Sequence, residues 1–212
     1  MARPEIENCQ AFLGMNLTAS LLERTIVYRM WQAPFARKKF APVIANNDLR
    51  QVRRVLDVAC GPGTNAGYFA HTGYLGVDLN ERYIQDARRR YRRDFVAANA
   101  LDHDAVSGQF DFILINSFLH HLDSGEVVKI LSRLREVLSK DGYIHILELV
   151  LPEHRSIARV LARWDRGKFA RCLSEWRTIF NQLFEPVLFL PYSVGLGTSL
   201  WNMVYFKGRA RT

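Results

Sequence analysis

Apolar and polar positions change their spacing repeatedly along this 212-residue chain. Short apolar runs are typical of strands, whereas apolar residues at three- and four-residue steps are typical of helices. The pattern predicts strands at 55–59, 74–79, 95–98, 110–117, 143–151, 187–190 and 200–206. It predicts helices at 6–45, 64–71, 81–91, from 124 to about 142, and over most of 156–184. This alternation favours βαβ units and a parallel sheet.

The helix that follows residue 123 has the clearest local signals. Ser124 is a candidate N-cap, apolar residues recur at helical spacing from 127 to 138, and Gly142 stands where a C-terminal glycine cap is expected. We predict a single domain, in which residues 1–50 form an N-terminal helical cap and residues 51–212 form the α/β core.

Composition and charge narrow the class of protein. The sequence is 49% hydrophobic and 24% charged, which is typical of a soluble globular domain. The net charge of +8 is concentrated at 88–93 (RRRYRR) and at Arg37, Lys38 and Lys39. We interpret these runs first as solvated helix ends. A nucleic-acid or membrane surface is the less favoured interpretation.

The three cysteines are widely spaced and form no CxxC pair, so we expect neither a disulfide framework nor a metal site. An apolar run of the roughly 20 residues needed to cross a bilayer is missing from the sequence. We therefore expect a cytoplasmic protein that does not enter the membrane.

The most informative segment is 55–66, which reads VLDVACGPGTNA. A glycine-rich turn between a strand and a helix lets a ligand approach the backbone closely and exposes helix N-terminal amides. The spacing Gly61-x-Gly63-x-x-Ala66 alone also satisfies a loose dinucleotide fingerprint, so it separates few families. It indicates a nucleotide-like ligand.

Two acids lie beside this turn. Asp57 ends the strand that precedes it, where a carboxylate would repel a pyrophosphate but suits a ligand with an ammonium group, as in S-adenosylmethionine. Asp78 ends the second predicted strand, where a carboxylate accepts the hydroxyls of a ribose at the carboxyl edge of the sheet. Asp78 suits NAD equally well. Capping or loop roles for these acids are the alternative interpretation.

The sequence resembles the class I S-adenosylmethionine-dependent methyltransferases in three ordered motifs. Residues 57–63 (DVACGPG) resemble the first motif, with Ala59 in place of the commonest first glycine. Residues 76–80 (GVDLN) resemble the second-strand motif, and residues 116–122 (NSFLHHL) resemble the fourth-strand motif. The resemblance implies a doubly wound, mostly parallel seven-stranded sheet with helices on both faces, an antiparallel C-terminal strand pair and an N-terminal helical lid.

The resemblance also implies S-adenosyl-L-methionine as the cofactor. The residues expected to bind it are Asp57, Ala59, Cys60, Gly61, Gly63, Asn65, Asp78, Leu79, Asn99, Ala100, Asn116 and Ser117. Family members commonly place an Asp after the third strand to accept the adenine amino group, whereas this chain has Asn99 there. Asn accepts through its carbonyl oxygen, and Asp102 is the alternative acceptor.

Methyl transfer depends mainly on positioning and exclusion of water, and a general base helps when the acceptor is a hydroxyl. His120 or His121 is the candidate base, with a structural role as the alternative. Glu148, near the end of the fifth strand, either faces the acceptor or pairs with a basic residue at the surface.

The segment 164–192 is aromatic and is the candidate acceptor pocket, although core packing is the favoured interpretation of its aromatic residues. The leading hypothesis is methyl transfer to an oxygen or nitrogen of a small molecule. An RNA or protein methyltransferase, an NAD-dependent oxidoreductase and a non-catalytic nucleoside-binding domain remain open. Oligomeric state is not predicted.

Overall fold

The computed structural model describes residues 35–152, 169–196 and 198–211, except for the side chains of 196, 198 and 199. The chain divides into two compact units, residues 1–37 and residues 38–212. Most of the predicted N-terminal cap, residues 1–34, lies outside the described residues, and so does the 153–168 part of the predicted helix at 156–184. The larger unit begins at Lys38, inside the segment predicted as the cap.

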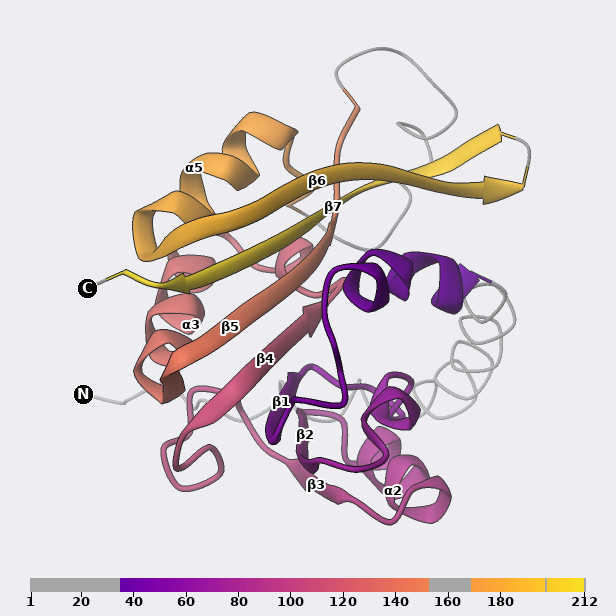
Figure 1. Ribbon diagram of the computed structural model, residues 1–212, viewed down its shortest axis with the longest axis vertical. Coiled ribbons are helices and arrows are strands. Elements are labelled where there is room, and N and C mark those ends of the chain that lie inside the picture. The colour runs from indigo at the N-terminus through magenta and orange to yellow at the C-terminus, as the bar shows by residue number, and fades with distance from the viewer. Residues whose placement is uncertain (1–34, 153–168, 197, 212) are drawn as a thin grey trace, which may run out of the picture. The chain divides into compact units, whose positions relative to one another are not determined.

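The larger unit is built on one seven-stranded sheet (Figure 1). Its strands are β1 (Arg54–Val58), β2 (Gly73–Asp78), β3 (Asp94–Ala97), β4 (Phe110–Asn116), β5 (Leu138–Leu149), β6 (Phe184–Leu196) and β7 (Thr198–Ala210). The spatial order is β3-β2-β1-β4-β5-β7-β6. The first five strands are parallel, and β7 pairs antiparallel with both β5 and β6. The predicted fold class is confirmed.

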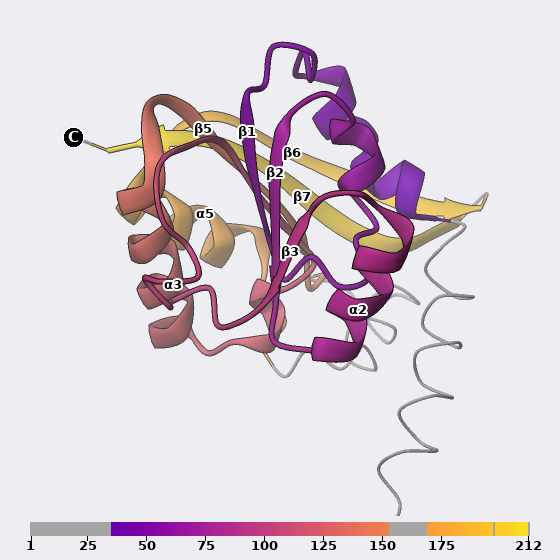
Figure 2. The ribbon, with the colours of Figure 1, turned by 90° about the horizontal axis from the view of Figure 1, so that it is seen from below.

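Helices cover both faces of this sheet (Figure 2). The elements are η1 (Ala66–Phe69), α2 (Glu81–Arg90), η2 (Leu119–His121), α3 (Ser124–Val137) and α5 (Leu173–Leu183), and residues 35–45 are also helical. One apolar cluster joins α3 and α5 to the sheet, and a second joins the 38–45 helix, η1 and α2 to the opposite face. Phe40 and Val43 are fully buried in this second cluster, so residues 38–45 belong to the core.

Three local predictions are wrong in detail. Residues 64–71 contain only the four-residue η1 within a series of turns. The N-cap of α3 is Asp123, which forms a capping box with Glu126, so Ser124 is the first helical residue. Gly142 lies inside β5, where an added Cβ would sit 2.7 Å from Ser139 Oγ and 3.0 Å from Asp111 Cα. This glycine therefore permits a close approach to β4 and caps no helix.

The last two strands are much longer than predicted. β6 lies at the edge of the sheet and contains Pro186 and Pro191, which lack the N–H that an inner strand must donate. Proline in these positions obscures a strand in the sequence but is compatible with an edge. Across the described ranges, no helix is both long and apolar enough to span a membrane.

Candidate functional site

The carboxyl ends of the parallel strands bring most of the predicted site residues to one edge of the sheet. Asp78 and Asn116 are the last residues of β2 and β4, and Asp57 and Glu148 lie one residue before the ends of β1 and β5. In an open α/β sheet, this is the edge at which ligands bind.

The glycine turn after β1 has an unusual backbone. Ala59, Gly61 and Gly63 all have positive φ, at 55°, 55° and 77°. A Cβ added to Gly61 would meet no atom within 4 Å, so open space lies over this residue. A Cβ on Gly63 would instead lie 3.1 Å from the rings of Phe95 and Tyr91, because this glycine packs against the interior. The turn thus has one glycine facing space and one facing the core.

The amides of this turn are used within the protein. The Gly61 amide donates to Asp78 Oδ2 at 2.9 Å, and the amides of Gly63 and Ala66 donate to the carbonyls of Cys60 and Gly63 at 3.1 and 3.0 Å. The amides of Gly61, Gly63 and Ala66 are thus paired within the protein, and the four-residue η1 replaces the predicted helix.

Asp78 is partly exposed and holds two backbone segments together. Its Oδ2 accepts the Gly61 amide, and its Oδ1 accepts the Asn80 amide at 2.8 Å. Asn80 in turn caps α2 through its side chain. Each carboxylate oxygen has a second lone pair, so Asp78 still has capacity to accept hydroxyl groups.

Asp57 is fully buried beneath the turn. Its Oδ2 accepts the Tyr74 hydroxyl at 2.6 Å and the Asn65 amide at 3.3 Å. Its Oδ1 is buried, and no described residue donates a hydrogen bond to it. Burial raises the pKa of Asp57 to about 7, against the hydrogen bonds from Tyr74 and Asn65, which lower it. The predicted direct contact with a ligand ammonium is not available to a carboxylate sealed in this way.

Asn65 connects the glycine turn to the end of β4. Its Oδ1 accepts from Asn116 Nδ2 at 3.2 Å, and the Ser117 hydroxyl donates to Asn116 Oδ1 at 3.2 Å. Ser117 has a φ of 58°, and its amide donates to the Leu147 carbonyl at 2.7 Å. A left-handed non-glycine residue costs about 1–2 kcal/mol, so the surrounding bonds must hold the chain in this turn.

The turn after β4 is held by a second buried acid, Glu148 on β5. Its Oε1 accepts the amides of Phe118 and Leu119 at 2.8 and 2.6 Å, and its Oε2 lies 2.7 Å from His120 Nδ1. Burial acts to raise the pKa of Glu148, but the charge of His120 and these hydrogen bonds outweigh it and lower the pKa. Glu148 is therefore ionised at neutral pH.

This geometry favours the structural alternative for two of the predicted residues. His120 is only 2% exposed and Glu148 is fully buried, and the two side chains bond each other and the turn after β4. Glu148 does pair with a basic residue, but in the interior and not at the surface. His121 is exposed, and its ring centroid lies 4.2 Å from that of His120.

Residues 55–142 match the family model described as a methyltransferase domain. Over these residues, which are less than half of the chain, the sequence is similar to methyltransferase domains. A fatty-acid O-methyltransferase of Mycolicibacterium smegmatis is 35% identical over 98 residues, which are 43% of this chain and 35% of that protein. A malonyl-[acyl-carrier protein] O-methyltransferase of Enterobacter lignolyticus is 28% identical over 131 residues, which are 59% of this chain and 51% of that protein. The matched regions thus span about half or less of these relatives.

Solved structures share the fold at low sequence identity. The mitomycin 7-O-methyltransferase MmcR superposes with a TM-score of 0.70 at 16% identity, over 90% of this chain and 58% of that one. The magnesium protoporphyrin IX methyltransferase of Synechocystis PCC 6803, solved with bound SAH, superposes with a TM-score of 0.69 at 15% identity. The superposition covers 91% of this chain and 95% of that one.

The adenine side of the predicted cofactor site is only partly formed by the predicted residues. Leu79 is 74% exposed next to Asp78, and an exposed apolar side chain there suits the face of a planar base. Asn99 is exposed, but its Oδ1 accepts the Leu101 amide at 3.0 Å. Asp102 accepts the Asp104 amide in the same way, and Ala100 is buried. Both candidate acceptors are thus turn residues in this structure.

The structure contains two buried polar residues that are not apparent from the sequence. Tyr74 bonds Asp57 across neighbouring strands, two register positions apart, and this relation is visible only once β1 and β2 are paired. Arg171 is 5% exposed and donates to the carbonyls of Leu119 and Leu122 at 3.3 and 2.8 Å. These carbonyls flank the two histidines, about 50 residues away in sequence, and no local pattern connects them to Arg171.

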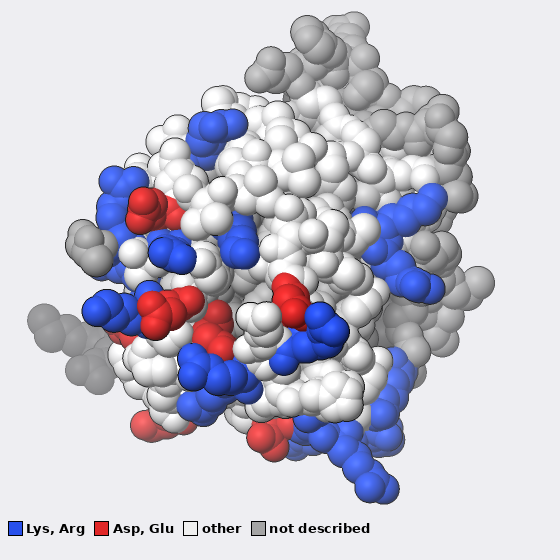
Figure 3. Space-filling view, viewed as in Figure 1, with Lys and Arg blue, Asp and Glu red and all other residues white. Residues whose placement is uncertain are grey.

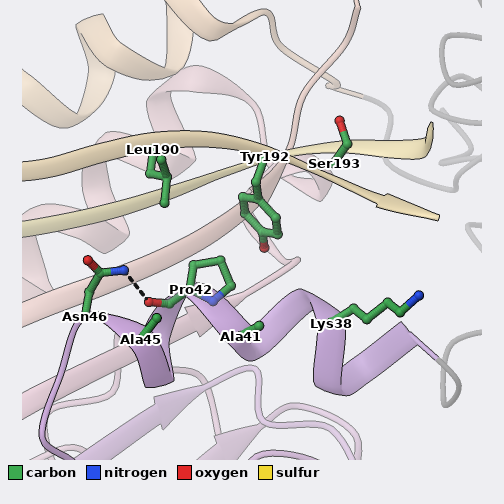
Figure 4. Close-up of a pocket in the computed structure, with 8 residues that line it drawn as sticks. All are labelled: Lys38, Ala41, Pro42, Ala45, Asn46, Leu190, Tyr192 and Ser193. Atoms are coloured by element: carbon green, nitrogen blue, oxygen red, sulfur yellow. Dashed lines mark hydrogen bonds between the residues drawn. The ribbon is translucent and has the colours of Figure 1, made fainter. Parts of the chain in front are cut away.

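Several of the aromatic residues predicted as a possible acceptor pocket are core residues, whereas Phe169 is 39% exposed. Trp176, Phe180 and Phe184 are fully buried between α5 and the sheet, and Phe189 packs against the same cluster. Trp164 lies outside the described residues. A groove of about 410 Å³ does lie between the 38–46 segment and β6, with Leu190 and Tyr192 pointing into it (Figure 4). None of the predicted cofactor residues lines this groove.

The arginines at 88–93 have structural partners at the amino edge of the sheet. Arg88 Nε donates to the Phe95 carbonyl at 2.9 Å, and Arg93 Nη1 donates to the Thr72 carbonyl at 3.1 Å. Lys39 is buried, with its ammonium 5.7 Å from the centre of the Trp201 ring. Figure 3 shows Lys and Arg mixed with Asp and Glu on the face it displays. These observations favour the structural interpretation of the basic runs.

Proposed function

We propose that this protein transfers the methyl group of S-adenosyl-L-methionine to an oxygen or nitrogen atom of a small-molecule acceptor. The carrying observation is the edge formed by the open space over Gly61, the partly exposed Asp78 that is bonded to its amide, and the exposed Leu79. These groups fit a nucleoside with a charged amino-acid tail. When bound, this cofactor supplies an electrophilic methyl group on a sulfonium ion.

The protein's own residues then position the cofactor and the acceptor, exclude water and accept the proton that the acceptor loses. Asp78 has free acceptor capacity for ribose hydroxyls, and Leu79 offers an apolar surface to the base. His120, Glu148 and Arg171 fix the turn after β4, and the exposed His121 on that turn is our candidate for the proton acceptor. The names of the two O-methyltransferase relatives support oxygen as the acceptor atom.

Binding of the cofactor is tested by thermal unfolding with S-adenosylhomocysteine. A ligand present at 100 times its dissociation constant stabilises a protein by about 2.7 kcal/mol, so a clear rise in Tm is expected. NAD serves as the control and should give no rise. A shift with NAD alone would remove the proposed function.

Asp78→Ala should weaken S-adenosylhomocysteine binding by about 1.5–3 kcal/mol, because it removes charge-assisted hydrogen bonds. The same change also frees the Gly61 and Asn80 amides, so Tm must be measured alongside affinity. Asp94→Ala, an exposed acid at the amino end of β3, is the matched control. Unchanged affinity in a folded Asp78→Ala protein would contradict the assignment.

Acceptor class is tested with labelled cofactor against panels of carboxylic acids, phenols, amines and RNA. Label on small oxygen or nitrogen acceptors is the expected result. Label in RNA instead, with binding that weakens steeply as salt is raised, would replace the small-molecule acceptor with a nucleic acid.

A further inference from the structure

We propose that Tyr74 and Asp57 are a proton-linked positioning pair beneath the glycine turn, so that the protein binds its cofactor more tightly once Asp57 has lost its proton. This inference rests on the proposed function, because it concerns the same cofactor. It assigns a role to Tyr74, whose hydroxyl donates to Asp57.

The geometry of Asp57 gives the first argument. One carboxylate oxygen is bonded by Tyr74 and Asn65, while the other is buried with no donor among the described residues. A buried carboxylate with incomplete hydrogen bonding is costly to ionise. The acid is therefore poised between its neutral and charged forms.

The groups that face Asp57 give the second argument. From β2 come Tyr74 and Asp78, and from the turn comes the Cys60 thiol. Burial raises the pKa of both the Tyr74 phenol and the Cys60 thiol, so both are neutral at pH 7, and Tyr91 acts on Tyr74 from beyond α2. Asp78 carries a like charge. No cation is among these influences, so an approaching cation would add to the hydrogen bonds of Tyr74 and Asn65 in favouring the charged form of Asp57.

The cofactor supplies that cation. Its amino-acid tail bears an ammonium group. The glycine turn follows Asp57 closely in the chain, after the last residue of β1. The carboxylate attracts the ammonium through the turn without touching it, since Coulomb attraction between charges is strong in a low-dielectric interior. Asp57 then releases its proton to the solvent as the cofactor binds. The pKa of Asp57, about 7, places this linkage in the neutral range.

The linkage is measured as the affinity for S-adenosylhomocysteine between pH 5.5 and 7.5. In the wild-type protein we expect affinity to rise with pH, approaching ten-fold per pH unit at the acid end. Calorimetry in two buffers of different ionisation enthalpy should show release of up to one proton. In Asp57→Asn the pH dependence should be lost.

Tyr74→Phe separates a positioning role from a merely structural one. The hydroxyl lowers the pKa of Asp57, so its removal should raise that pKa and shift the affinity curve to higher pH. A structural defect would instead weaken binding equally at every pH. Tyr143→Phe is the matched control and should leave the curve unchanged, because Tyr143 lies on β5, three strands away from β2, with its hydroxyl bonded by Arg209.

Each outcome has one meaning. A wild-type protein that binds S-adenosylhomocysteine with the same pH dependence as Asp57→Asn overturns the inference and leaves the proposed function intact. A protein that binds no S-adenosylhomocysteine at any pH overturns the proposed function itself. An unshifted curve in a folded Tyr74→Phe protein removes Tyr74 from the pair.

Discussion

Two turns at the same edge of the sheet each have a buried acid beneath them, but the pKa values of the two acids are shifted in opposite directions. The turn after β1 has Ala59 at positive φ and the buried Asp57 beneath it, and the turn after β4 has Ser117 at positive φ and the buried Glu148 beneath it. Burial raises the pKa of Asp57 to about 7, whereas the pKa of Glu148 is lowered despite burial. Both acids are fully buried, so burial alone does not explain the difference.

The hydrogen-bond donors around each carboxylate explain the difference in pKa. Asp57 has a hydroxyl and a side-chain amide on one oxygen only, whereas Glu148 has backbone amides and the His120 ring distributed over both oxygens. A carboxylate that accepts several hydrogen bonds beside a cation stays ionised even when desolvated. The turn after β4 is thus held by a permanent charge, and the turn after β1 by a group that can change its charge.

The largest expected loss of stability follows from removing the Glu148 carboxylate. Glu148→Ala should lower the free energy of unfolding by about 3–5 kcal/mol at pH 7, because it leaves a buried partner and two amides uncompensated. Chemical denaturation measures this loss. Glu185→Ala, an exposed acid on β6, is the control and should stay within about 0.5 kcal/mol.

The pH dependence of the Glu148 contribution has a defined sign. Its folded pKa lies below the ordinary value of 4.5, so the stabilisation is complete above that value and is lost as the pH falls through the lower folded pKa. The gap between wild type and variant should narrow below about pH 4. A gap that is constant down to acid pH would show that Glu148 acts by packing alone.

Asp57→Asn should show the opposite trend. The pKa of Asp57 is 3.8 in its ordinary state and about 7 in the fold, so its stabilisation is complete below 3.8 and is lost as the pH rises through 7. Relative to wild type, the variant should gain up to about 4 kcal/mol of stability between pH 4 and 8. Denaturation at several pH values measures it, and a flat difference would contradict the contrast between the two acids.

The smallest effect concerns the backbone of the first turn. Ala59→Gly should stabilise the protein by about 0.5–1 kcal/mol, because relief of the left-handed conformation exceeds the entropy cost of glycine. Ala70→Gly, at an exposed residue with a φ of −59°, is the control and should destabilise by a similar amount. Equal effects of both changes on Tm would show that Ala59 is not strained.

Much of the fold was predictable because short-range patterns determine it. The apolar run at 110–117 became β4, and the helical spacing after residue 81 became α2. The predictions failed where a distant contact overrides local preference. Gly142 reads as a helix cap but lies in β5 against Asp111, and the prolines of β6 hide an edge strand.

The residues of the candidate site also separate into those that local sequence predicts and those that depend on distant contacts. Gly61, Gly63 and Asp78 were visible in the sequence because a tight turn and the acid that ends the next strand are local features. The partners of the acids were not visible. Tyr74 meets Asp57 only through the β1–β2 register, and Arg171 reaches the histidine turn from about 50 residues away.

The sequence by itself therefore determined the fold class, the order of the elements and the position of the glycine turn, since periodicity and turn chemistry depend on neighbouring residues. The tertiary structure decided the state and role of each polar group at the edge. It sealed His120 and Glu148 inside, left His121 exposed, and gave two buried carboxylates opposite pKa shifts. The physical reason is that ionisation depends on which donors surround a buried oxygen, and those donors come from strands and loops far apart in the chain.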